Sequence, residues 1–534
     1  MEGKVYGIDL GTTYSCIATV PTEGGEAKII KNAEGTNTTP SVVYFESDSN
    51  VVVGDTAKDN VIMDPEKTVS FVKRHIGRND EFSFEYNGQN LTPEEVSAYI
   101  LKKLVTDAEA QLGEKIENVV ITHPAYFGIN EKQATKNAGI IAGLNVVSLI
   151  DEPVAAAYSY SCDSDENNGK TVLVYDLGGG TFDVTLIKID EKEVKVICTG
   201  GDCNLGGYNW DERLIEHLVA RFCEATGASE DELFDDPEMR AVLQAKAEKM
   251  KKELSSKEIS KTSIKADSGA AKIEVTRDEF NSITADLCER TIMLTNDMIE
   301  EAKAKATREG FEFNGFDTIL LVGGSTKMDQ IREAVYKEFG IEPISYEQDE
   351  AVAKGAALYG VTVLNTPDEP VWPDIPVGPS VDPQIGIIHG KGITTVTSKS
   401  FGIKVSNDAG EEYISNIILK NTPLPADYTK RFRTGYDNQG EALLELYETE
   451  VNEERAELMM GVVIGEATLK LPPNTPKDTP IEVNFKINDQ GLLEFTGREL
   501  TSNIECSGIV DVKNGLTQQQ IEESIKRMQN TLVE

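Results

Sequence analysis

The chain of 534 residues lacks several features that mark particular classes of protein. No run approaches the roughly 20 apolar residues that a membrane-spanning helix needs. The first four residues lead straight into a strand-like segment, which leaves no room for a signal peptide. The seven cysteines form no Cys-x-x-Cys pair, and the four histidines show no metal-ligand spacing. We therefore expect a cytoplasmic protein with reduced thiols, no membrane partner and no zinc site.

Positive charge is also scarce. The chain has 52 Lys and Arg residues against 91 Asp and Glu, a formal net charge of −39. Such a field repels nucleic-acid phosphates, so a nucleic-acid partner is not expected. A nucleotide is not excluded, because a bound Mg²⁺ brings its own positive charge to a local site. The length predicts two or more domains.

Two apolar runs each end in an Asp that is followed by a turn rich in Gly and Thr. The first is Asp9-Leu10-Gly11-Thr12-Thr13 and the second is Asp176-Leu177-Gly178-Gly179-Gly180-Thr181. Backbone N–H groups, hydroxyls and a carboxylate in so few residues suit a metal-bound polyphosphate. Taken alone, either loop could be a purely structural hairpin turn. Their recurrence predicts two similar halves that grip a nucleotide from both sides.

The G-x-x-x-x-G-K-[ST] spacing of a Walker-type phosphate loop is absent from both places. Strand-like residues follow each loop, at 16–20 and 184–189, so we expect each loop to be the bend of a β-hairpin. A third run, residues 318–327, is a strand that leads into small residues, and its Gly323-Gly324 pair would permit close approach of a base or ribose.

Short apolar strands alternate with amphipathic helical segments from residue 5 to about 363, the pattern of an α/β domain. Within it we expect a helix capped at Asn130 and two longer helices over 237–254 and 277–307. Six prolines between 365 and 392 predict an extended linker or covering arm. Alternating strands then indicate a compact sandwich, and a helix over 517–533 closes the chain.

These loops resemble those of the actin, sugar-kinase and heat-shock-chaperone superfold. Further segments narrow the resemblance to the heat-shock protein 70 (DnaK-type) chaperone family: 71–74, 123–127, 151–157, 201–207, 248–256 and 349–353. The similarity is dense over 5–362 and looser over 400–534.

The resemblance implies four parts. They are a two-lobed, actin-like ATPase domain of duplicated halves over 1–363, a proline-rich linker over 364–398, a β-sandwich substrate-binding domain over 399–512, and a truncated lid helix over 513–534. It implies a slow ATPase that controls the binding of extended hydrophobic segments, in protein folding and stress response. Unfolded peptides, a J-domain co-chaperone and a nucleotide-exchange factor are the implied partners.

The resemblance also assigns roles at the site. Lys73 would lie beside the γ-phosphate, Glu152 would orient the attacking water, and Asp9 and Asp176 would hold Mg²⁺ through its waters. Thr181 and Asp176 join Lys73 and Glu152 as catalytic residues. The remaining residues would hold ATP or ADP, with K⁺ left open as a second ion: Gly11, Thr12, Thr13, Tyr14, Gly178, Gly179, Gly180, Glu248, Lys251, Lys252, Ser255, Gly324, Ser325, Thr326 and Lys327. Phosphoryl transfer needs such positioning and charge neutralisation more than covalent chemistry.

Several positions depart from the family pattern. The linker lacks the usual Leu-rich stretch, Lys132 replaces an arginine, and the residues expected to arch over a bound peptide are Gly410 and Gly435. These changes leave a second hypothesis open: a specialised partner protein that binds ATP structurally, with little hydrolysis and no ordinary client cycle. A sugar or acetate kinase is disfavoured, because the C-terminal β-domain has no place in one.

Overall fold

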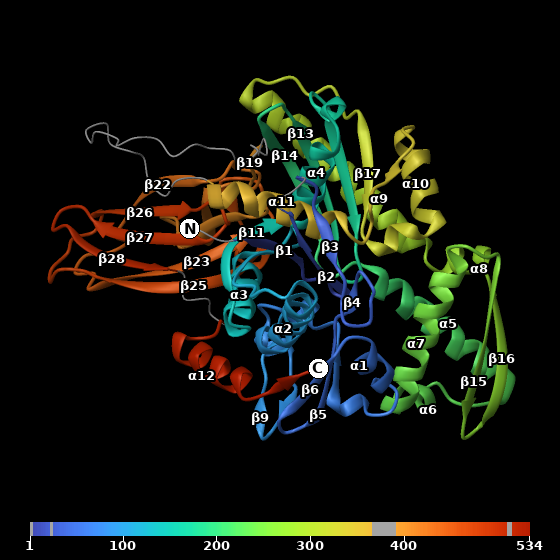
Figure 1. Cartoon of the computed structure of the whole chain (residues 1–534). Coiled ribbons are helices and arrows are strands. Elements are labelled where there is room, and N and C mark those ends of the chain that lie inside the picture. The colour runs from blue at the N-terminus through green and yellow to red at the C-terminus, as the bar shows by residue number, and fades with distance from the viewer. Residues whose placement is uncertain (1–3, 22–24, 366–390, 510–514) are drawn as a thin grey trace.

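The structure, a computed structural model, describes residues 4–21, 25–365, 391–509 and 515–534 (Figure 1). Most of the proline-rich segment falls outside these ranges, so its predicted extended conformation is not tested. Among the described residues, no helix is both long and apolar enough to cross a membrane.

Two sheets of the same topology form the centre of the molecule. The middle of each sheet is an antiparallel hairpin. Two parallel strands lie beside its first strand, and one antiparallel strand lies beside its second strand. The first sheet contains β1 (Val5–Asp9), β2 (Tyr14–Thr19), β3 (Lys28–Ile30), β10 (Asn118–His123) and β11 (Asn145–Asp151). The second contains β12 (Thr171–Leu177), β13 (Phe182–Ile189), β14 (Glu193–Asp202), β17 (Thr318–Val322) and β18 (Ile344–Ser345). The predicted duplication is therefore confirmed, and both Gly/Thr loops are hairpin bends.

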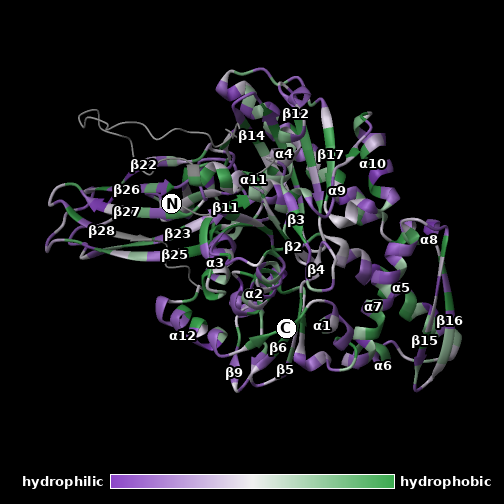
Figure 2. Ribbon diagram, in the orientation of Figure 1, coloured by the Kyte–Doolittle hydropathy of each residue, from purple (hydrophilic) through white to green (hydrophobic). Residues whose placement is uncertain are grey.

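Two helices cross between the sheets and share one apolar core with them, α4 (Glu152–Asp163) and α11 (Ala351–Asn365). The crossing is close: a Cβ added at Gly355 would lie 1.8 Å from the carbonyl oxygen of Ala155. Figure 2 shows hydrophobic residues along the central strands and hydrophilic ones on outer helices. This arrangement makes the carboxyl ends of β1 and β12 face each other.

Each half carries further elements around its sheet. The first half adds β4 (Thr39–Pro40), β5 (Val42–Ser47), β6 (Asn50–Val53), β7 (Thr68–Ser70), β8 (Glu85–Tyr86), β9 (Gln89–Asn90), α1 (Asp55–Asn60), α2 (Pro93–Leu112) and α3 (Ile129–Ile141). The second adds α5 (Gly207–Thr226), α6 (Asp231–Phe234), α7 (Pro237–Leu254), β15 (Ile259–Ala266), β16 (Gly269–Thr276), α8 (Arg277–Ile283), α9 (Ala285–Glu309) and α10 (Asp329–Phe339).

Three helix predictions are corrected. The helix expected over 277–307 is two helices, because Thr284 leaves helical geometry and its hydroxyl donates to the Phe280 carbonyl at 2.8 Å. The helix expected to be capped at Asn130 begins at Ile129, whose N–H donates to the Glu448 carboxylate at 3.4 Å. The final helix, α12 (Gln518–Gln529), ends early because Leu532–Val533 forms a strand, β29.

Residues 400–509 form the predicted β-sandwich around an apolar core that includes Phe401, Leu446 and Phe485. One sheet contains β20 (Ser400–Ser406), β21 (Glu412–Ile418), β23 (Glu441–Thr449), β24 (Arg455–Ala456) and β25 (Gly461–Lys470). The other contains β22 (Ala426–Arg433), β26 (Pro480–Ile487), β27 (Leu493–Glu499) and β28 (Ile504–Ile509).

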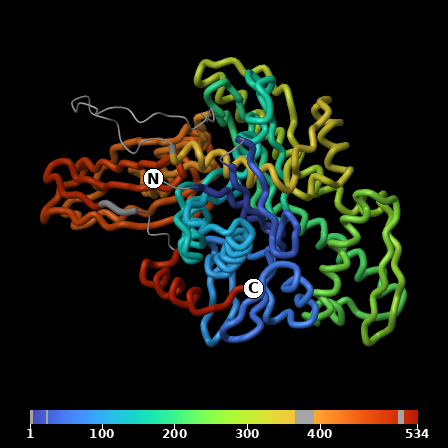
Figure 3. Tube along the Cα trace, viewed as in Figure 1, coloured from blue at the N-terminus to red at the C-terminus, as the bar shows by residue number. Residues whose placement is uncertain are grey.

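The sandwich packs against both halves (Figure 3). Ahead of it, β19 (Gly392–Thr394) pairs in parallel with β14, and the Thr395 hydroxyl donates to Asp151 at 2.8 Å. Lys420 forms an ion pair with Glu301 at 3.0 Å, and the Ser398 hydroxyl donates to the Phe127 carbonyl at 3.1 Å. Residues 392–394 thus dock as a strand without a Leu-rich stretch, since strand pairing uses backbone groups.

Candidate functional site

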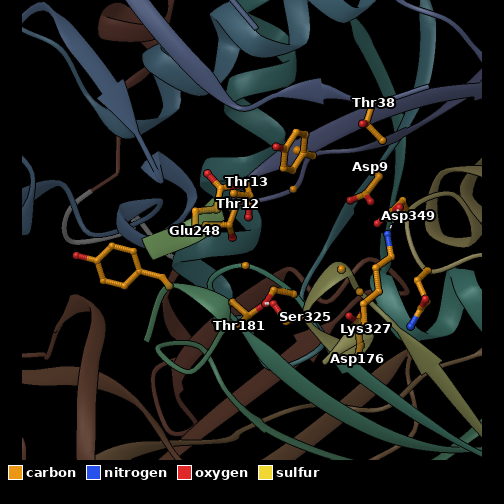
Figure 4. A pocket seen from close by; sticks show the side chains of 18 of the residues that line it. Asp9, Thr12, Thr13, Thr38, Asp176, Thr181, Glu248, Ser325, Lys327 and Asp349 are labelled. Atoms are coloured by element: carbon orange, nitrogen blue, oxygen red, sulfur yellow. Dashed lines mark hydrogen bonds and ion pairs between the residues drawn. The ribbon is translucent and has the colours of Figure 1, made fainter. Parts of the chain in front are cut away.

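A cavity of about 570 Å³ lies between the two halves, where the two hairpin loops face each other (Figure 4). All but two of the residues predicted for the site line this cavity. The exceptions are Gly180, which lies against the backbone of Gly206, and Thr326, whose hydroxyl donates to the Gly323 carbonyl at 2.7 Å.

The two loops approach each other closely at one end of the cavity. A Cβ added at Gly179 would lie 1.7 Å from the Thr13 hydroxyl, so any larger residue there would have to displace the Thr13 side chain. Neighbouring segments hold each loop in place. Ser41 donates to the Gly11 carbonyl at 2.7 Å, and Ser325 donates to the Gly178 carbonyl at 2.8 Å. The loops therefore form a preformed cradle of backbone and hydroxyl groups.

Four carboxylates gather beneath the loops. Asp9 ends β1, Asp176 lies in β12, Asp183 lies in β13 and Glu152 begins α4. Burial raises the pKa of Asp9 to about 7 and that of Asp183 to about 8, and the nearby charge of Glu152 adds to both shifts. Burial also raises the pKa of Asp176 well above its usual range. Among the described residues, no three acidic, His or Cys side chains converge closely enough to hold a metal ion directly, so this cluster of carboxyl oxygens suits a divalent cation that keeps its waters.

Lys73 is the cation that faces these carboxylates. It lies in a short 3₁₀ turn, and its ammonium forms an ion pair and hydrogen bond with Glu152. The Lys73 and Glu152 side chains are only 4% and 10% exposed. Ions are costly to bury, so a buried pair at the base of the loops indicates that two charged groups are needed at this position.

The opposite end of the cavity is formed by α7 and by the turn over Gly324–Lys327. On α7, Lys251 forms an ion pair with Asp211 at 2.7 Å, while Glu248 pairs with Lys252 at 2.6 Å. Burial alone would raise the pKa of Glu248, but the charges of Lys58 and Lys252 outweigh it and lower that pKa to about 2. Glu248 is therefore a fixed carboxylate beside the cavity.

Lys58 joins the two halves across the cavity mouth. It lies on α1 in the first half and forms an ion pair with Glu248 in the second at 2.8 Å. Lys58 and Lys252 also each donate to the Tyr14 hydroxyl at 3.0 Å. Tyr14 follows the first loop, so this network ties the loop to both sides of the mouth.

Sequence reasoning missed several residues around the cavity. Asp349 lines it and pairs with Lys327, and it belongs to a segment that had already been singled out for the resemblance. Asp211 and Thr38 also line the cavity, and Lys58 pairs with Glu248 beside it, yet no local pattern marks them. Their contacts join elements that are distant in the chain.

The arrangement combines a phosphate-sized cradle, a buried acidic cluster with one lysine, and a second polar end. The cavity volume falls within the range of about 300–1,000 Å³ that is common for small-molecule sites. These features suit a ligand that carries a polyphosphate and a cation at one end and a polar ring system at the other.

Comparison with known families agrees with this geometry. A family model described as "Hsp70 protein" matches residues 5–534, which include both halves, the sandwich and the C-terminal helix. Because this match covers nearly the whole chain, the protein belongs to the Hsp70 family.

Proposed function

We propose that this protein is an ATP-dependent chaperone, which hydrolyses ATP slowly to control its binding of extended hydrophobic segments. The observation that carries the proposal is the buried Lys73–Glu152 pair beside Asp9 and Asp176, under two facing Gly/Thr loops. Members of the Hsp70 family are generally chaperones and ATPases, which supports the proposal.

In this proposal the Gly/Thr loops hold the phosphates. Asp9 and Asp176 hold Mg²⁺ through its waters, and Mg²⁺ neutralises charge that develops on the phosphates. Lys73 faces the terminal phosphate, and Glu152, held by Lys73, orients the attacking water. Thr181 contributes its hydroxyl to the second loop. The polar groups at the far end hold the adenosine: Glu248, Lys251, Lys252, Ser255, Gly324, Ser325, Thr326 and Lys327.

We assign the remaining parts in the same way. Residues 1–363 would be the ATPase domain, 364–398 the linker, 399–512 the substrate-binding domain and 513–534 the remnant of a lid. Val405, Phe432 and Ala442 are partly exposed apolar side chains that pack on the sandwich core, which suits contact with an apolar peptide. Unfolded segments, a J-domain co-chaperone and an exchange factor are the proposed partners, in the cytoplasm, where all seven cysteines stay free.

A second function, a partner protein that binds ATP structurally, is favoured by one observation. Gly410 and Gly435 stand at the positions that would arch over a bound peptide, and as glycines they have no side chain to do so. No other atom lies within 4 Å of a Cβ added at either position, so neighbouring groups do not fill the space. Open binding of this kind predicts fast peptide release.

Single-turnover hydrolysis of ATP, with and without an extended apolar peptide, tests the proposal. We expect slow turnover that the peptide accelerates, because peptide binding would act on the docked sandwich. ATP that stays intact in the purified complex, together with no measurable peptide affinity, would select the structural partner instead.

A further inference from the structure

The C-terminal segment lies on the first half of the ATPase domain. Figure 1 shows α12 beside α2 and α3, with the C-terminus near β5 and β6. Eight residues, 510–517, separate the end of β28 in the sandwich from the start of α12. The segment therefore runs from one domain to the other.

The helix contacts the first half through a buried, specific set of side chains. Ile521 and Met528 are 7% and 5% exposed and belong to the same apolar cluster as Val96 and Tyr99 of α2. Glu95 of α2, itself 4% exposed, accepts a hydrogen bond from the Ser524 hydroxyl at 2.7 Å and forms an ion pair with Arg527. Losing α12 would remove both of these partners from Glu95.

The chain end then extends a sheet of the first half. Strand β29 pairs in parallel with β6 and forms the edge of a sheet whose order is β29-β6-β5-β7. The Leu532 N–H donates to the Ser49 carbonyl at 2.8 Å, and the Glu534 N–H donates to the Val51 carbonyl at 3.0 Å. The Val53 N–H in turn donates to the Glu534 carbonyl at 2.8 Å. The C-terminal strand thus covers an edge that would otherwise be open to pairing.

We propose that residues 515–534 are a strap that keeps the sandwich docked on the ATPase domain even when no nucleotide is bound. The sandwich contacts the second half through Lys420 and the adjoining β19, and it contacts the first half directly at Ile129 through Glu448. The strap adds a separate attachment to the first half. Because only residues 510–517 lie between β28 and α12, release of the direct contacts leaves their partner surfaces at high effective concentration while the strap holds. Undocking then requires the direct contacts and the strap to open together.

Hydrogen exchange of the full-length, nucleotide-free protein tests the strap. The reporter is the Thr199 amide of β14, which donates to the Asn421 side chain of the sandwich at 3.1 Å, a contact to the second half. Two variants weaken the strap: truncation after Asn530, which removes β29, and Arg527→Gln. Lys526→Gln, an exposed charge on the same helix, is the matched control. Protection in β12, inside the ATPase core, reports that each variant is folded.

We expect the Thr199 amide to be protected from exchange in the natural protein and in the control. In both strap variants it should exchange at least about tenfold faster, a factor that corresponds to about 1.4 kcal/mol. Equal protection in the strap variants would overturn the proposal, as would an unprotected Thr199 in the natural protein. A second arm adds ATP and Mg²⁺ to the truncated protein and rests on the proposed function. If the strap variants undock but ATP does not restore protection, the strap stands and the ATP-driven cycle fails.

Discussion

At the scale of single residues, the Lys73–Glu152 pair is the feature that most needs a functional explanation. Both side chains are nearly inaccessible, and three further carboxylates lie around the same end of the cavity. A buried ion pair adds little net stability compared with an apolar pair of similar size. Its position under the two loops, where a terminal phosphate would lie, accounts for its presence.

Replacement of this lysine is the direct test. We expect Lys73→Ala to bind ATP but to lose hydrolysis by about 10²–10³-fold, because the positive charge beside the reacting phosphate is removed. Equilibrium binding of ATP and single-turnover hydrolysis measure the two effects separately. Lys67→Ala, an exposed lysine just ahead of the same turn, should change neither. Normal turnover in Lys73→Ala would refute the role of Lys73.

At the scale of elements, helix α3 shows how one domain completes another. The first N–H groups of a helix need acceptors, and a local side chain usually supplies one. Here the sandwich does so: the Glu448 carboxylate from β23 lies at the start of α3 and accepts from Ile129 at 3.4 Å. The start of α3 is therefore part of the interface between the domains.

Burial of Glu448 at this interface should make docking sensitive to pH. Burial raises the pKa of Glu448 to about 7 and the charge of Glu131 adds to the shift, while Lys399, the hydrogen bond from Ile129 and Lys132 oppose it. The docked state therefore favours the protonated acid. Its stabilising contribution is complete below the ordinary glutamate pKa of about 4.3 and is lost as the pH rises through 7.

Glu448→Gln imitates the protonated acid, so its docking should not weaken over this range. At pH 8 we expect the variant to be more stable than the natural protein by about 1–3 kcal/mol, since each pKa unit corresponds to about 1.4 kcal/mol. Urea unfolding at pH 5 and pH 8 measures this difference. Glu441→Gln, an exposed acid on the same strand, serves as the control. If both variants follow the same pH profile as the natural protein, the interface role of Glu448 is wrong.

At the scale of the whole molecule, the two halves are joined at the base of the cavity and again beside its polar end. Helices α4 and α11 join the halves at the base through a crossing that Gly355 makes possible. At the mouth the connection is polar, through Lys58, Glu248 and Tyr14. A packed base and a polar mouth are the arrangement of a hinge.

Lys58→Ala should therefore speed nucleotide release. Loss of this partly buried ion pair, worth about 1–1.5 kcal/mol, predicts about tenfold faster dissociation. Stopped-flow release of a fluorescent ADP analogue measures the rate. Lys249→Ala, an exposed lysine on α7, removes the same charge without touching Glu248 and should leave the rate unchanged. An unaltered rate in Lys58→Ala would show that the mouth does not limit release.

The parts that the sequence predicted well depend on local chemistry. The twin Asp-Gly-Thr turns and the strands around them are contained in short segments, and the structure confirms both. The helix predictions failed where the deciding contact lies far away. Asn130 loses the cap position in a helix that begins against Glu448, and the last helix stops where the chain pairs with β6.

By itself, then, the sequence determined the duplicated hairpins, the α/β and β-sandwich parts, and most residues around the cavity, because backbone turns and side-chain periodicity act over a few positions. Only the tertiary structure decided that Lys58 joins the two halves, that Glu448 completes α3, and that the C-terminal segment lies on the first half. Each of these contacts joins residues separated by 190 or more positions. Only the folded arrangement of both domains brings such distant groups together.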